Sequence, residues 1–232
     1  MIGFYDYTVV LTYLSLFISV FGMTQASAGR FRTAVFCLAL SGLCDMFDGK
    51  IARTKKNRTD DEKSFGVQID SLCDVVCFGI FPAMLCHLLG VRGVLGIIIV
   101  GYYCICSVIR LAYFNVLETK RQQVEDGANK YYHGLPITSM AIVLPLVFML
   151  QVFVSNTVFI ISLYIALFVV GSLFIIDFKL KKPSNRMLCV LVCIVAVAVI
   201  IIIVFSGFHI PKRSFHEQPL WKIIKNALGG CV

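Results

Sequence analysis

The sequence predicts an all-α membrane protein, a bundle of six core transmembrane helices with about one extra helix near the C-terminus. Hydrophobic residues make up 59% of the 232 residues and charged residues only 15%, with a mean hydropathy of +0.87. This composition lies far outside that of an ordinary soluble domain. Apolar stretches of about 20 residues, long enough to cross a bilayer, recur along the chain. They lie at approximately 8–26, 32–52, 66–89, 93–117, 135–154, 157–177 and 187–206.

Short polar segments separate these stretches. The first stretch begins close to Met1 without a basic leader, so we expect it to remain as a helix. A charged segment, 54–63, joins the second helix to the third, and a longer one, 118–133, joins the fourth to the fifth. Pro136 lies at the start of the fifth, where proline is favoured. We therefore expect one membrane domain over residues 1–182, followed by a further transmembrane helix and a basic tail over 183–232.

Basic residues predict the orientation in the membrane. Lys and Arg accumulate on the cytoplasmic side of membrane proteins, and segments 50–63, 120–130 and 179–186 are rich in both. A cytoplasmic N-terminus places all three segments inside. The formal charge of +8 then indicates attraction to anionic lipid rather than nucleic-acid binding, because the basic residues flank apolar spans.

Four aspartates interrupt this apolar pattern at helical spacing. Asp45 and Asp48 are three residues apart near the end of the second predicted helix, and Asp70 and Asp74 are four apart on the third. Each pair therefore lies on one helix face. A carboxylate at membrane depth costs about 2.5 to 3.5 kcal/mol on insertion scales, so four together imply a shared ligand. The ends of these helices place the site on the cytoplasmic side.

Oxygen ligands alone suit hard cations such as magnesium, manganese or calcium, and the site offers no His and Cys set for zinc. Four carboxylates are enough for two ions, an arrangement that supports displacement at phosphorus. A structural alternative is that the aspartates pair with Lys50, Arg53 or Arg110, or cap helix ends near water.

The residues around the aspartates resemble the signature of the CDP-alcohol phosphotransferases. The matching positions are Asp45, Asp48, Gly49, Ala52, Arg53, Gly66, Asp70 and Asp74. Twelve residues separate Arg53 from Gly66, more than in most members. We expect the excess, Lys55 to Lys63, to form a longer cytoplasmic turn.

Within that family the chain is most similar to the membrane-integral phosphatidylserine synthases. The similarity extends through Asp70–Gly79, Arg110–Asn115 and Gly134–Pro136, and more weakly to Leu11–Thr12 with Ser15 and to Asp177–Lys179. It covers roughly residues 8 to 182. The resemblance implies transfer of a phosphatidyl group from CDP-diacylglycerol to the hydroxyl of L-serine, with release of CMP, by a homodimeric enzyme among membrane lipids.

The resemblance also implies roles for individual residues. Divalent metal, Mg²⁺ or Mn²⁺ with Ca²⁺ as a substitute, would be held by the four aspartates, and Asp74 would be the general base. The nucleotide and its diphosphate would contact Thr12, Gly49, Ala52, Arg53 and Gly66. The acceptor would contact Arg110, Asn115 and Lys120.

Alternatives remain open for several of these residues. Arg53 could be a positive anchor, Arg110 a structural partner of an aspartate, and Asn115 and Lys120 solvated groups at a helix end. Another acceptor, such as glycerol 3-phosphate or an inositol phosphate, would keep the same chemistry, although it calls for more basic residues near the site. A cation transporter that uses the carboxylates as its ion site is a different class, but the repeats and broken helices of such proteins are not evident.

Overall fold

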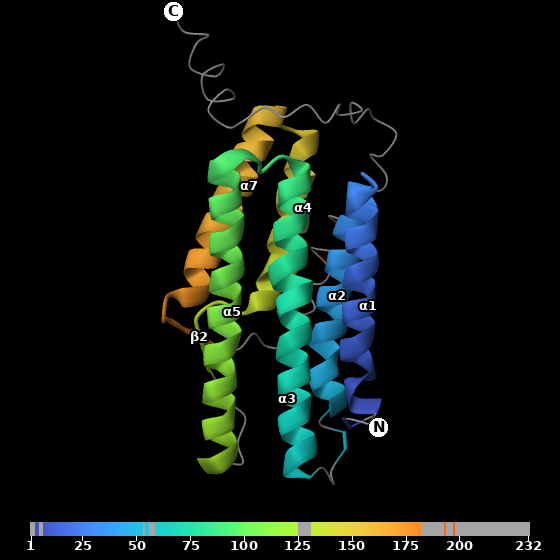
Figure 1. Ribbon diagram of the computed structural model, residues 1–232, viewed down its shortest axis with the longest axis vertical. Helices are drawn as coiled ribbons and strands as arrows, with labels where there is room; N and C mark the ends of the chain where they lie inside the picture. The colour runs from blue at the N-terminus through green and yellow to red at the C-terminus, as the bar shows by residue number, and fades with distance from the viewer. Residues whose placement is uncertain are drawn as a thin grey trace, which may run out of the picture.

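The computed structural model describes residues 3–4, 7–52, 54–55, 59–124, 131–181, 193 and 197. Within these residues the chain forms an α-helical bundle (Figure 1). Its elements, in order, are a 3₁₀ turn η1 (Tyr7–Val9), α1 (Val10–Ser27), α2 (Phe31–Ala52), α3 (Asp60–Asp74), a π-helical turn η2 (Val75–Ile80), α4 (Phe81–Leu89), α5 (Gly93–Val124), β1 (Tyr131–His133), η3 (Ile137–Ser139), α6 (Met140–Met149), η4 (Leu150–Val152), α7 (Asn156–Ile175) and β2 (Lys179–Lys181).

The predicted all-α fold is confirmed, and each of the first six apolar stretches is helical. In the described part of the chain, four helical segments are long and apolar enough to cross a membrane. They are Tyr7–Ser27, Asp60–Leu89, Gly93–Thr119 and Asn156–Ile175. The protein is therefore a multi-pass membrane protein. Helix α2 has 22 residues, but Arg32, the two aspartates and Lys50 lower its hydropathy. The predicted seventh helix, 187–206, lies outside the described residues except at positions 193 and 197.

The third helix begins earlier than predicted, at Asp60. Thr59 caps it, because its hydroxyl accepts from the amide of Glu62 while the Glu62 carboxylate accepts from the amide of Thr59. Acidic residues in the first turn, including Asp60, also suit the helix dipole. The expectation of a longer turn over Lys55 to Lys63 is therefore wrong for residues 60–63, which extend α3 by about one turn.

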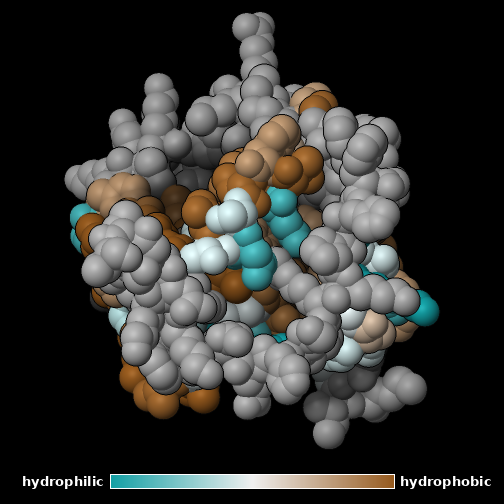
Figure 2. Space-filling model, turned by 90° about the horizontal axis from the view of Figure 1, so that it is seen from above, coloured by the Kyte–Doolittle hydropathy of each residue, from teal (hydrophilic) through white to brown (hydrophobic). Residues whose placement is uncertain are grey.

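The bundle packs around α3 and α4, which follow one another as a single column (Figure 1). Helices α1 and α2 lie side by side on one flank of this column and α5 lies on the other. Large side chains fill the interior, including fully buried Phe78, Phe81 and Tyr103. Equally large apolar residues such as Phe17 and Ile97 are exposed, as expected of a surface that faces lipid. Figure 2 shows the end where α4 meets α5, with hydrophilic residues near the centre of this face among hydrophobic ones.

A short antiparallel ladder, which the sequence analysis did not foresee, joins two connecting segments. Strand β1 pairs with β2, with Tyr132 opposite Leu180. The contact continues into the bundle, because the amide of Gly134 donates to the Phe178 carbonyl at 2.8 Å and the amide of Leu135 donates to the Leu173 carbonyl at 3.2 Å. The ladder therefore fixes the start of α6 against the end of α7.

Candidate active site

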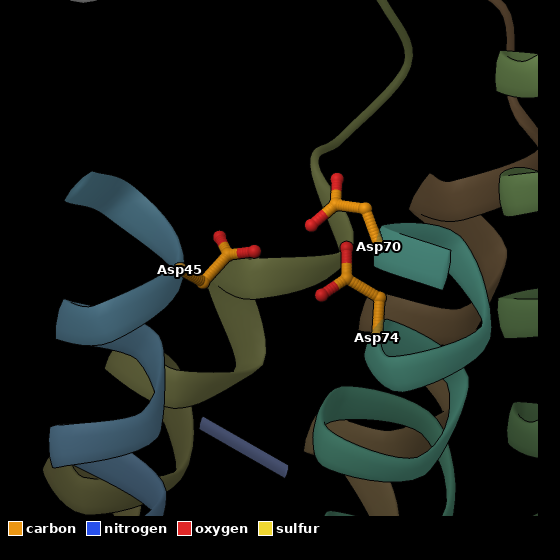
Figure 3. A group of neighbouring side chains, drawn as sticks. All are labelled: Asp45, Asp70 and Asp74. Carbon is orange, nitrogen blue, oxygen red and sulfur yellow. The ribbon is translucent and has the colours of Figure 1, made fainter. Parts of the chain in front are cut away.

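Three of the four predicted aspartates converge between two helices. Asp45 comes from α2, and Asp70 and Asp74 come from the last turns of α3 (Figure 3). Their side chains point toward one another, and one carboxylate oxygen from each lies within 4.8 Å of the other two. The carboxyl groups of Asp45 and Asp74 are within hydrogen-bonding reach. The sequence spacing placed each pair on one face, and helix packing brings the two faces together.

The fourth aspartate, Asp48, lies beside this group. It is 8% exposed, and its Oδ2 accepts a hydrogen bond from the Thr12 hydroxyl at 3.2 Å. Its carboxyl group also contacts that of Asp70. Thr12, on α1, is therefore attached to the aspartate group through Asp48, so the site draws on α1, α2 and α3.

The donor set fits a hard divalent cation. The converging atoms are all carboxylate oxygens, the ligands that magnesium and manganese prefer. Among the described residues, Asp70 Oδ1 is buried and has no hydrogen-bond partner. Adjacent carboxylates in a membrane interior repel one another, and an unpaired buried oxygen is costly, so a cation between them would offset both costs. We conclude that the group can hold divalent metal.

A cluster of hydroxyl groups, which the sequence analysis did not single out as a unit, lies one turn from the aspartates. The Ser15 and Ser41 hydroxyls are 2.8 Å apart, and Ser19 donates to the Ser41 hydroxyl at 2.8 Å. Ser15 also contacts the Cys77 sulfur at 3.8 Å. Ser41 precedes Asp45 by four residues and Cys77 follows Asp74 by three. These spacings place Ser41 and Cys77 on the same helix faces as the aspartates, which was the signal available in the sequence. Only the packing of the helices brings their side chains together with Ser15 and Ser19.

The predicted acceptor residues lie on α5. Arg110 is 6% exposed and donates from Nε to the Leu135 carbonyl at 2.9 Å, which ties it to the start of the α6 segment. Asn115 accepts a hydrogen bond from the Ser71 hydroxyl at 2.7 Å, and Ser71 follows Asp70 directly. Lys120 belongs to the last turns of α5, and its side chain lies outside the described part of the structure. The structure thus links Asn115 to the aspartate helix.

The predicted nucleotide residues flank the aspartates along the same two helices. Gly49 directly follows Asp48 and is exposed. Ala52 and Gly66 are partly buried, four residues after Asp48 and four before Asp70. Arg53 lies outside the described residues. Small residues on these turns leave room for a ligand to approach the backbone closely.

Comparison with known families agrees with this geometry. The family model for CDP-alcohol phosphatidyltransferase matches residues 7–171, most of the chain. The chain belongs to this family. The match covers α1 to α7 almost completely and includes all four aspartates. It lies within the predicted 1–182 domain, whose end at 182 stays a prediction.

Individual relatives of this CDP-alcohol phosphatidyltransferase carry related names. The chain is 33% identical over 147 residues to a CDP-diacylglycerol–serine O-phosphatidyltransferase of Saccharomyces cerevisiae, which covers 60% of this chain and 51% of that protein. It is 34% identical over 131 residues to an archaetidylserine synthase of Methanothermobacter thermautotrophicus, with 56% and 49% covered. A serine O-phosphatidyltransferase of Helicobacter pylori is 28% identical over 144 residues, with 61% and 56% covered. The chain thus spans about half the length of these relatives.

Proposed function

We propose that this protein transfers a phosphatidyl group from CDP-diacylglycerol to the hydroxyl of L-serine and releases CMP. The observation that carries the proposal is the convergence of Asp45, Asp70 and Asp74 within 4.8 Å in a chain of the CDP-alcohol phosphatidyltransferase family. The names of the relatives support serine as the acceptor. Among the described residues, Arg110 is the arginine that lies well inside a membrane-spanning helix, and so few basic groups near the site favour serine over a phosphorylated acceptor.

The four aspartates would form the metal site. Asp45, Asp48, Asp70 and Asp74 would hold one or two divalent ions, Mg²⁺ or Mn²⁺, with Ca²⁺ as a substitute. When bound, the metal neutralises oxygens of the diphosphate and of the departing phosphate. Thr12 would keep Asp48 in place through its hydrogen bond.

Asp74 would act as the general base. Its carboxylate takes the proton from the serine hydroxyl as the serine oxygen forms a bond to the phosphorus that bears diacylglycerol. The bond from that phosphorus to the oxygen bridging to CMP breaks, and CMP departs with the electron pair. Asp74 lies inside the group, so one side chain can face both the metal and the acceptor.

The substrates would approach from flanking turns. Gly49, Ala52, Arg53 and Gly66 would lie along the nucleotide and its diphosphate, with Thr12 beside them. Arg110, Asn115 and Lys120 would recognise the acceptor. The hydrogen bond between Ser71 and Asn115 supports this assignment. It holds the side-chain amide of Asn115 against Ser71, which directly follows the predicted metal ligand Asp70.

We also propose that the site faces the cytoplasm. The hydroxyls of Tyr7 and Thr54 are 3.2 Å apart, so the start of α1 and the segment after α2 share one end of the bundle. The β1–β2 ladder likewise joins the segments before α6 and after α7. Pairing within each set agrees with the even number of crossings that this orientation requires, and the basic residues indicate which side is cytoplasmic. A homodimer is our further proposal, testable by light scattering of the purified protein in detergent.

The decisive experiment is CMP release from CDP-diacylglycerol by purified protein with Mn²⁺ or Mg²⁺. L-serine is compared with glycerol 3-phosphate, inositol phosphates and no acceptor, and CDP-archaeol is tested as a second donor. Asp74→Asn is measured beside Asp60→Asn, a matched control on the same helix whose carboxylate is exposed and pairs with Lys63.

Serine-dependent release that Asp74→Asn abolishes and Asp60→Asn retains supports the proposal. Release with another acceptor keeps the family and replaces serine. Preference for CDP-archaeol changes the donor lipid. No metal-dependent release with any acceptor contradicts the proposal.

A further inference from the structure

The helix that carries Asp74 changes its geometry immediately after this residue. Residues Val75–Ile80 form a π-helical turn, and the amide of Phe81 donates to the carbonyl of Val76, five residues earlier. The next residue is Pro82. In a continuous α-helix the amide of residue 82 would donate to the carbonyl of Phe78, but proline has no amide hydrogen and its ring clashes with that carbonyl. Pro82 therefore disfavours a regular α-helix at this point.

A side chain from the neighbouring helix satisfies the carbonyl that Pro82 cannot. The Tyr103 hydroxyl, on α5, donates to the Phe78 carbonyl at 2.6 Å. Both residues are 0% exposed. The backbone approaches α5 closely here, since a Cβ at Gly79 would lie 3.2 Å from the Cβ of Ser107. A buried hydroxyl is thus aimed at the carbonyl for which Pro82 offers no α-helical donor.

The π turn determines where Asp74 points. Asp74 and Phe81 are seven residues apart, which in a regular α-helix is about 20° short of two full turns, so both would face the same neighbour. In the structure the turn holds one more residue than an α-helical turn, which rotates the part of the helix before it against the part after it by about 100°. The Phe81 ring lies in the core at Gly22 of α1, close to Cys37 of α2, and Asp74 points toward Asp45 of α2 (Figure 3). With an α-helical turn and the same core contacts after it, Asp74 would point about 100° away from its present direction.

We propose that Tyr103 is a positioning residue for the metal site. Its hydroxyl holds the π turn at Phe78, and the π turn directs Asp74 and Asp70 toward Asp45 while the following residues keep their apolar side in the core. Tyr103 does this without touching substrate or metal. The inference rests on the proposed metal site, and its test uses metal affinity rather than catalysis.

The test is a titration of purified protein with Mn²⁺, followed by the electron paramagnetic resonance signal of the free ion. Tyr103→Phe removes only the hydroxyl. We expect Mn²⁺ affinity to fall about tenfold or more, the size of effect usual when support of metal ligands is lost. The matched control is Tyr102→Phe, which removes the same atom one residue away, where the hydroxyl lies 3.0 Å from that of Ser172. The control is expected to bind Mn²⁺ within about twofold of wild type, given its distance from the π turn.

A second variant separates positioning from support of the fold. Pro82→Ala with Tyr103→Phe restores an amide hydrogen for Phe78, so an α-helical bond can form. We expect this double variant to regain the thermal stability that Tyr103→Phe loses while its Mn²⁺ affinity stays about tenfold weak or weaker. Unchanged affinity in Tyr103→Phe overturns the proposal, as does recovery of both stability and affinity in the double variant.

If Tyr103→Phe cannot be purified folded, Gly79→Ala carries the test, because its new Cβ would lie 3.2 Å from the Cβ of Ser107 and would require the π turn and α5 to separate by a few tenths of an ångström. Weaker Mn²⁺ binding in Gly79→Ala supports the positioning role, and wild-type affinity overturns it. Absence of Mn²⁺ binding by the wild-type protein would instead contradict the proposed metal site itself.

Discussion

Replacing Thr12 by valine tests whether Asp48 is held for function. The substitution keeps the shape of the side chain and removes the hydroxyl that donates to Asp48 Oδ2. Both residues are buried, so water cannot simply replace the lost donor. We expect weaker Mn²⁺ binding and slower CMP release, because Asp48 loses the contact that orients it.

The magnitude follows from the geometry of the bond. A hydrogen bond to a charged group contributes about 1.5 to 3 kcal/mol. The distance of 3.2 Å is long for a hydroxyl donor, which favours the lower end of that range. About 1.5 kcal/mol corresponds to roughly a tenfold change, since about 1.36 kcal/mol is a factor of ten.

The assay measures Mn²⁺ affinity and CMP release for Thr12→Val and for Thr24→Val. Thr24 is a matched control on the same helix, because its hydroxyl donates only to the Phe21 carbonyl at an exposed position. Thr24→Val is expected to resemble wild type. If Thr12→Val keeps both affinity and rate within about twofold of wild type, the reasoning about Asp48 is refuted.

Three further predictions concern neighbouring contacts. Ser71→Ala leaves the Asn115 amide oxygen without its donor at 2.7 Å, so we expect a higher KM for serine with little change in the KM for CDP-diacylglycerol; equal changes in both would count against a role for Asn115 in acceptor binding. Gly42→Ala introduces a Cβ 2.5 Å from that of Ala141 and should lower thermal stability by about 1 to 3 kcal/mol, with recovery in Gly42→Ala/Ala141→Gly; a variant as stable as wild type would show that α6 moves freely from α2. Mn²⁺ at about 100 times its dissociation constant should stabilise the folded protein by about 2.7 kcal/mol, measured by thermal unfolding with and without chelator, and Asp70→Asn should lose most of this gain; equal stabilisation of the variant would place the metal elsewhere.

The sequence was most informative about features that are local along the chain. Apolar stretches predicted the first six helices, because bilayer thickness sets their length. Asp45 with Asp48, and Asp70 with Asp74, could be placed on helix faces from spacing alone. The residues of the helix cap, Thr59 and Glu62, could also be seen in the sequence. The similarity to family members with a shorter segment nevertheless favoured a turn over 55–63, whereas in the structure α3 begins at Asp60.

Only the tertiary structure could join groups that are distant in sequence. The contact between Thr12 and Asp48 and the cluster of Ser15, Ser19 and Ser41 depend on how closely α1 approaches α2. The strand pairing of β1 with β2 connects segments more than 40 residues apart, beyond the reach of a local pattern.

The π turn shows most clearly which features the sequence predicts and which depend on tertiary packing. Pro82 in the sequence signals that the helix is disturbed, because proline removes one backbone donor. The sequence does not say where the Phe78 carbonyl then finds a donor, and the Tyr103 hydroxyl on another helix supplies it. The residues of the candidate site could therefore be named from the sequence. The direction in which Asp74 faces was decided by packing, because it depends on a rotation within one helix that a contact with its neighbour holds in place.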